Sequence, residues 1–181
     1  RQIAFLDPVV HMPNLRALSR ALNGTSWSTL CFLRIPELEL LGRHYGVLLR
    51  IQYKQMLANH LRTLLQPNEA VYHLAGHDLV FRLNSEGHQA RIHLIDRSLR
   101  QFRFHWDGVP LQPRIGMSYC NVRSPVKHLY LLLGELNTIA DMSLASGHPE
   151  NLQLRGAGHV QQDLEDKVVM MNRILKALEH D

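Results

Sequence analysis

The sequence has few cysteines and no long hydrophobic run. Its 181 residues include two cysteines, Cys31 and Cys120, without the CxxC spacing of a zinc or redox motif. Both lie in apolar, strand-like stretches, so we expect two buried, reduced thiols in a cytosolic protein. No apolar run approaches the roughly 20 residues that span a bilayer, and the start has no secretory signal pattern. The chain begins at Arg1 rather than Met, so we expect it to come from a longer protein.

The composition is that of an ordinary globular protein. Hydrophobic residues make up 45% and charged residues 20% of a length that can bury one core with an appendage. A net charge of +4 permits contact with nucleic acid or acidic lipid without requiring it. The 12 histidines are scattered. His73 and His77 are four residues apart, but no third ligand is near in sequence, so we expect no metal site there.

Apolar periodicity and turn residues predict the secondary structure. They predict helices over 15–23, 37–46, 47–66, 86–100 (capped by Ser85), 125–146 and 158–181. They predict strands over 28–35, 71–74, 79–83, 101–106, 109–120 and 151–154. Asp107-Gly108 predicts a tight hairpin turn, and Ser124-Pro125 predicts an N-cap followed by proline at the first helical position. On the helix over 47–66, the face expected to be buried carries Leu49, Tyr53, Met56, Leu57, His60, Leu61 and Leu64.

This order of elements indicates an α+β fold. We expect one mixed central sheet with a ferredoxin-like βαββαβ kernel and helices on its faces. Gly156-Ala157-Gly158 indicates a hinge, so we divide the chain into a domain over 1–157 and a helix over 158–181. The helix carries one apolar seam, made of Val160, Leu164, Val168, Met171, Leu175 and Leu178. The seam suits either packing on the core or a linker that dimerises or leads to another domain, and the hinge favours the linker.

The hairpin over 71–83 has a chemically distinctive tip. Its turn, Ala75, Gly76, His77 and Asp78, combines a glycine with an imidazole and a carboxylate. Such a turn could hold a metal ion or a phosphate, or it could serve only to reverse the chain.

Four segments follow one another in the order and spacing of a known family. They read DPVVHMPNL from Asp7, LELLGRHYGVLLRI from Leu38, HLAGHDL from His73 and RIGMS from Arg114. To about Leu154, the chain resembles GGDEF domains, the diguanylate cyclases that make cyclic di-GMP from GTP. The resemblance implies the GGDEF, nucleotide-cyclase-like fold and places HLAGHDL at the signature hairpin of the family.

The resemblance also implies that the metal chemistry of the family has been lost. Such cyclases hold two metal ions with paired carboxylates. Arg34 and Pro36 stand at the two acidic positions at the end of the first strand, and a cation there would repel a metal ion. His77 replaces a signature carboxylate, and imidazole is a poor ligand for Mg²⁺. Asp78 keeps the next carboxylate, but one acid cannot build a two-metal site.

The substrate positions differ as well. Gly42 and Arg43 replace the Asn-Asp pair that reads guanine in the family. Ala75 replaces the first signature glycine, which lets phosphate approach the backbone, whereas Gly76 is retained. The resemblance therefore implies a signature turn that is vestigial and kept for its hairpin geometry.

The product-inhibition site is also degenerate. Gln66 and Glu69 stand at the outer positions of the inhibitory R-x-x-D motif, so the arginine that would bind a phosphate is missing. We therefore expect weak or absent binding of GTP and cyclic di-GMP. We expect no catalytic residue, no metal ligand and no cofactor in this chain.

The resemblance implies a regulatory role instead. Degenerate GGDEF domains commonly precede an EAL phosphodiesterase domain, joined by a helix such as the one over 158–181. We therefore expect a catalytically inactive regulatory or interaction domain of a bacterial cyclic di-GMP phosphodiesterase. Its covalently linked EAL domain would need Mg²⁺ or Mn²⁺. The resemblance implies a cytoplasmic domain whose parent is anchored in the inner membrane, and the helix could also form a homodimer.

The residues leave two alternative functions open, RNA binding and GTP sensing without turnover. The segment over 97–106 interleaves arginines with aromatic residues, which suits phosphate contacts beside base stacking. Phe102, Phe104 and Trp106 share one face of the expected strand, however, which favours the interpretation that they fill the core. For GTP sensing, Gly76 and the amides of the hairpin could still meet a phosphate.

Overall fold

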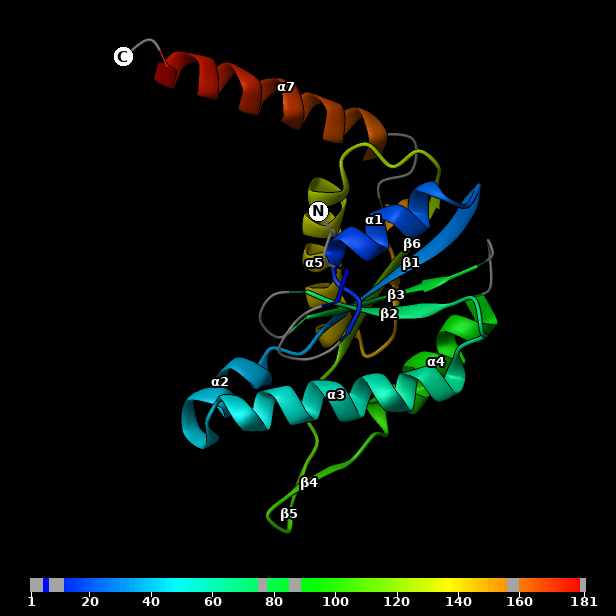
Figure 1. Cartoon of the computed structure of the whole chain (residues 1–181), viewed down its shortest axis with the longest axis vertical. Helices are drawn as coiled ribbons and strands as arrows, with labels where there is room; N and C mark the ends of the chain where they lie inside the picture. Colours follow the sequence, from blue (N-terminus) through cyan, green and yellow to red (C-terminus); the bar gives the residue numbers. More distant parts are fainter. Residues whose placement is uncertain (1–4, 7–11, 75–77, 85–88, 156–159, 180–181) are drawn as a thin grey trace.

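The computed structural model describes residues 5–6, 12–74, 78–84, 89–155 and 160–179. A five-stranded mixed sheet forms its centre, in the order β2-β3-β1-β6-β7 (Figure 1). The strands are β1 (Trp27–Arg34), β2 (Ala70–His73), β3 (Leu79–Leu83), β6 (Gly116–Arg123) and β7 (Glu150–Asn151). Only the β6–β7 pair is parallel among these neighbours. The order β6-β1-β3-β2 is that of a ferredoxin-like βαββαβ kernel, so the expected fold class is confirmed.

Helices cover both faces of this sheet (Figure 1). One face carries α1 (Leu15–Asn23) and α5 (Leu129–Ser146), and the other carries α2 (Glu37–Tyr45), α3 (Val47–Leu64) and α4 (Gln89–Arg100). After β7 come the single turn α6 (Leu152–Arg155) and the long α7 (Val160–Glu179), which lies at the margin of the molecule. No helix in the described ranges is long and apolar enough to cross a membrane.

Strand β1 separates two hydrophobic cores. Leu30 and Phe32 face the α1–α5 core, whereas Cys31 and Leu33 face the α3–α4 core. Burial on both faces explains why β1 reads as a continuous apolar run. Cys120 belongs to the α1–α5 core. Burial raises the pKa of the Cys31 thiol well above its usual range and that of Cys120 to about 12, so the prediction of two buried thiols is confirmed.

Local signals placed several boundaries correctly. Asn14 caps α1, because its side-chain oxygen accepts a 3.2 Å hydrogen bond from the Ala17 amide. Asp107 and Gly108 have φ values of 47° and 78°, as the expected hairpin turn requires. They join β4 (Phe104–Trp106) to β5 (Val109–Leu111), which form a separate two-stranded sheet below α3 in Figure 1.

The helix start expected at Ser124-Pro125 is wrong, because α5 begins at Leu129. The Ser124 amide donates to the Ser26 carbonyl at 3.0 Å and so extends the pairing of β6 with β1. The Val126 amide then donates to Asn23 Oδ1 at 3.1 Å, at the end of α1. These two backbone amides already have hydrogen-bond partners elsewhere in the fold. Entering a helix would therefore add no hydrogen bond for them.

Two of the expected strands are also shorter than the sequence suggests. The strand expected over 151–154 is wrong, because β7 ends at Asn151 and α6 starts at Leu152. At this helix start, Asn151 Oδ1 accepts a 3.0 Å hydrogen bond from the Gln153 amide. The strand over 101–106 begins only at Phe104, because the Gln101 and Phe102 amides still bond to carbonyls of α4. The expected strand over 109–120 divides into β5 and β6, and β6 continues to Arg123.

The remaining differences concern side chains and undescribed residues. On α3, Met56 is 46% exposed rather than buried, and Lys54 is buried in its place. The expected cap Ser85 and the expected hinge over 156–158 lie outside the described residues.

Candidate functional site

The signature hairpin lies beside a hollow of about 530 Å³. The hollow is formed where α1, β1, the β2–β3 hairpin and α5 meet. Its lining residues are Asn14, Leu15, Phe32, His73, Leu74, Asp78, Tyr130, Leu133, Gly134 and Asn137. Asp78 is thus the signature residue that the structure places at this site. Ala75, Gly76 and His77 fall outside the described residues.

Arg34 fixes a positive charge next to this hollow. It ends β1, directly opposite Gly116 of β6. Its Nε forms an ion pair with Asp141, and its Nη1 donates a 3.1 Å hydrogen bond to Asn137 Oδ1, which belongs to a residue lining the hollow. A guanidinium remains charged and only donates hydrogen bonds. Arg34 therefore cannot ligate a cation, and its contacts direct it toward α5.

The other substituted positions lie at the start of α2 or within it and do not line the hollow. Pro36 precedes α2, and Gly42 lies within it, where a side chain would meet Arg50. Arg43 pairs with Glu39 one turn away, at 2.8 Å on the exposed surface. Within the described part of the chain, no three His, Cys, Asp or Glu side chains gather as a metal site.

Glu69 of the degenerate inhibitory motif is an internal structural residue. Its buried carboxylate accepts backbone hydrogen bonds from Gln66 at 2.8 Å and from Asn84 at 3.0 Å. Arg91 on α4 donates from Nη1 at 2.7 Å and also pairs through Nη2. Burial alone raises the pKa of Glu69, but the bonds from Arg91 and the two amides outweigh burial and lower the pKa below its ordinary value of 4.5. Glu69 therefore joins the start of β2, the end of β3 and α4.

Lys54 is a site residue that sequence reasoning missed. Its side chain is buried, and its ammonium donates a 3.1 Å hydrogen bond to the Leu74 carbonyl, immediately before the signature turn. The signal was present, because residue 54 falls on the same helical ladder as Leu57, Ala58 and Leu61. A charged residue on a buried helix face requires a polar partner, and here that partner is the backbone of the hairpin.

The aromatic residues over 102–106 pack against α3, with Phe104 buried and the other two half-buried. Phe104 is buried, and its ring meets that of Tyr53 edge-on, with centroids 5.4 Å apart. Phe102 lies against both Tyr53 and His60, and Trp106 lies against Phe104. These rings pack against α3 and one another, so the core interpretation is confirmed for Phe104, and Phe102 and Trp106 are half-buried against the same core.

Comparison with known proteins identifies two close relatives in Escherichia coli K12, although no family model matches the chain. The cyclic di-GMP phosphodiesterase PdeF is 59% identical over 181 residues, which is 100% of this chain. The probable cyclic di-GMP phosphodiesterase PdeA is 30% identical over 176 residues, or 97% of this chain. In both cases the chain spans 24% of the length of the relative.

Solved structures share the fold at low sequence identity. The GGDEF domain of DgcB from Caulobacter crescentus, in complex with cyclic di-GMP, matches with a TM-score of 0.67 and 12% identity, over 84% of this chain and 98% of that chain. An EAL/GGDEF domain protein from M. capsulatus matches with a TM-score of 0.61 and 16% identity, over 75% of this chain and 93% of that chain. The chain is therefore a GGDEF-type domain in its fold, as the order and spacing of its segments predicted.

Proposed function

We propose that this chain is a regulatory GGDEF-type domain that does not itself form cyclic di-GMP. The observation that supports the proposal is the Arg34 contact with Asp141 and Asn137 at the edge of the hollow. Cyclisation of GTP by two metal ions requires carboxylates that bind the ions and neutralise the phosphate charge. Arg34 instead supplies a cation, and this cation is already neutralised by α5.

The cyclase prediction can be tested directly on the purified chain. Incubated with GTP and either Mg²⁺ or Mn²⁺, the chain should form no cyclic di-GMP detectable by chromatography, whereas an intact diguanylate cyclase serves as the positive control. The Arg34→Asp variant should remain inactive, because Pro36 and His77 are still present. Product formation by the unaltered chain would refute the proposal. Tight GTP binding without turnover in a parallel titration would favour the alternative of a GTP sensor.

The parent protein, in this proposal, is a cyclic di-GMP phosphodiesterase of the GGDEF–EAL type. The phosphodiesterase names of PdeF and PdeA and their much greater length support this. Hydrolysis would belong to a covalently linked EAL domain, which would use Mg²⁺ or Mn²⁺. The domain over 1–157 would lie in the cytoplasm and influence the EAL domain through the helix over 158–181, with the parent anchored in the inner membrane.

Helix α7 supports the further proposal of a homodimer. Among its described side chains, over 168–179, the exposed large apolar ones are Val169, Met170, Met171, Ile174, Leu175 and Leu178. A row of apolar side chains on a long helix is the pattern of a coiled-coil interface. In sedimentation equilibrium the chain should dimerise, Leu175→Asn should weaken the dimer, and the neighbouring Lys176→Asn should not. A chain that stays monomeric at the highest concentration examined would contradict the homodimer.

A further inference from the structure

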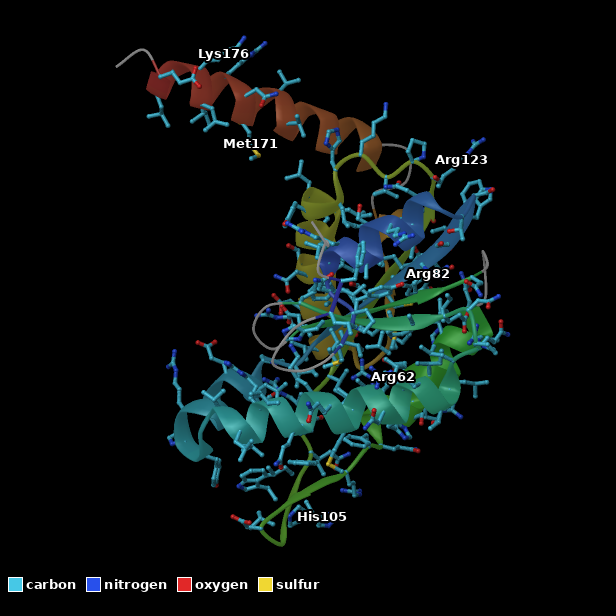
Figure 2. All side chains as sticks on the ribbon, in the orientation of Figure 1. Arg62, Arg82, His105, Arg123, Met171 and Lys176 are labelled. Carbon is cyan, nitrogen blue, oxygen red and sulfur yellow. The ribbon has the colours of Figure 1, made fainter. Side chains whose placement is uncertain are left out.

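A second hollow, of about 500 Å³, lies at the opposite end of the sheet from the signature hairpin. It opens beside the end of β6, where Arg123 is labelled in Figure 2. Its lining residues are Trp27, Cys120, Asn121, Val122, Arg123, Ser124, Pro125, Val126, Lys127, His128, Leu132, Leu152 and Gln153. None of these residues lines the hollow at the hairpin.

The rim of this second hollow is held in place by hydrogen bonds. The Ser124 amide bonds to the Ser26 carbonyl at 3.0 Å. The Val126 amide bonds to Asn23 Oδ1 at 3.1 Å, and the Ser124 hydroxyl lies 3.4 Å from the Asn23 carbonyl. The segment that replaces the expected start of α5 is therefore anchored to the end of α1. A hollow with such a rim is formed before any ligand arrives, which lowers the cost of binding.

The floor of the hollow is apolar. Val122, Leu132 and Leu152 belong to the α1–α5 core and show only their outer surfaces to the cavity. The polar groups on one wall already have partners, because Asn121 Oδ1 accepts from the Thr29 hydroxyl at 2.9 Å and the Asn121 carbonyl accepts from Gln153 Nε2. The interior therefore favours an apolar group over a strongly hydrated one.

The charged groups that line the hollow have one sign. Arg123 and Lys127 line it, and no Asp or Glu does. Arg34, Arg43, Arg91, Arg100 and Arg114 each pair with a carboxylate, whereas none of the ion pairs between side chains that the structure describes involves Arg123 or Lys127. The Arg123 guanidinium lies over the Trp27 ring instead, 5.5 Å from its centroid. Such a rim attracts anions.

From this combination we propose that the second hollow is a binding site for an amphipathic anion. The apolar body of the ligand would lie on Val122, Leu132 and Leu152, and its acidic group would bind Arg123 and Lys127. A nucleoside phosphate and a fatty acid both have this chemistry. The site is separate from the signature hairpin and from the inhibitory-motif position, and its test does not depend on whether the domain is a cyclase.

Trp27 provides an intrinsic reporter for the experiment. The chain has two tryptophans, and Trp106→Phe leaves Trp27 as the sole emitter. This variant is titrated with the amphipathic anion 8-anilinonaphthalene-1-sulfonate, and both Trp27 quenching and probe emission are followed. We expect saturable binding to one site. Adding Lys127→Gln or Arg123→Gln should weaken that binding about tenfold, the size expected for one charge-assisted contact.

A matched control and two competitors complete the test. Arg103→Gln removes an exposed arginine that bonds to Gln112, directly after β5 and away from the hollow, and it should leave probe affinity unchanged. Displacement by GMP would identify a nucleoside phosphate as the ligand class, and displacement by dodecanoate a fatty acid. Probe binding that is equally tight in Lys127→Gln and Arg103→Gln would place the probe elsewhere, on the apolar face of α7 for example, and overturn the proposal. Failure of both competitors would overturn it as well.

Discussion

Replacing Gly116 with alanine should lower the free energy of unfolding by about 3 kcal/mol. Gly116 starts β6, and a Cβ there would collide with the Ala140 carbonyl oxygen and lie 2.9 Å from Leu144 Cγ. The backbone of α5 cannot give way cheaply, because Ala140 is fully buried in the α1–α5 core. The added methyl should push α5 away from the sheet and loosen the ion pair between Arg34 and Asp141. Urea unfolding measures this loss as a lower midpoint concentration of urea, with the dependence of unfolding free energy on urea unchanged.

Gly134→Ala is the matched control on α5. A Cβ at Gly134 meets nothing within 4 Å, and the residue lies inside the helix, where alanine is favoured over glycine. We expect this variant to raise stability by about 0.5–1 kcal/mol. If Gly116→Ala were as stable as the unaltered chain, the close approach of α5 to β6 described above would be wrong.

Glu69→Gln should lower stability at neutral pH by about 3 kcal/mol, the size expected when one partner of a buried ion pair is removed. The amide cannot neutralise Arg91, and its NH₂ group, in either orientation, faces a donor from Arg91 and the backbone amide of Gln66 or of Asn84. The control is Glu39→Gln, which removes an equivalent arginine partner on the surface of α2. Because that pair is exposed, its loss should change stability by no more than about 0.5 kcal/mol.

The stability of Glu69→Gln and that of Glu39→Gln should depend differently on pH. The pKa of Glu69 is lower in the folded chain than its ordinary value of 4.5, so the ionised carboxylate stabilises the fold fully above that value. This contribution is lost as the pH falls through the depressed folded pKa. The unaltered chain and Glu39→Gln should therefore lose stability on acidification below about pH 4.5, and Glu69→Gln should lose less. If stability fell equally on acidification in all three proteins, Glu69 would not be the group that causes the loss.

Sequence patterns predicted the elements whose signals are local and failed where a distant partner decides. The helix over 15–23 and the turn at Asp107-Gly108 depend on residues close in sequence, and both form as expected. Ser124-Pro125 carries an equally good local signal for a helix start, but Asn23, about a hundred residues earlier, binds the Val126 amide and keeps the segment out of the helix.

In the candidate site, too, the sequence identified positions but not the distant residues that contact them. The alignment of segments identified Arg34 and Glu69 as substituted positions, but it could not supply their partners. Asp141 reaches Arg34 because α5 packs closely on β6, and Arg91 reaches Glu69 because α4 crosses the end of the hairpin. Lys54 lies on an apolar ladder that could have shown it to be buried, but its partner is a backbone carbonyl that no sequence motif marks.

The register of β1 and β6 also gives each hydrophobic core its own chemical probe. Leu30 lies opposite Cys120 and Cys31 lies opposite Tyr119, so the two thiols are neighbours along the sheet yet belong to different cores. Cys31 cannot be alkylated until the layer that covers it opens, whereas Cys120 is buried but also lines the second hollow. Labelling of Cys31 therefore reports the separation of α3 and α4 from the sheet, and labelling of Cys120 reports either the separation of α1 and α5 or access through the hollow. Equal rates under native conditions would mean that the domain opens as one cooperative unit, and faster labelling of Cys120 would show that its side of the sheet is reached first.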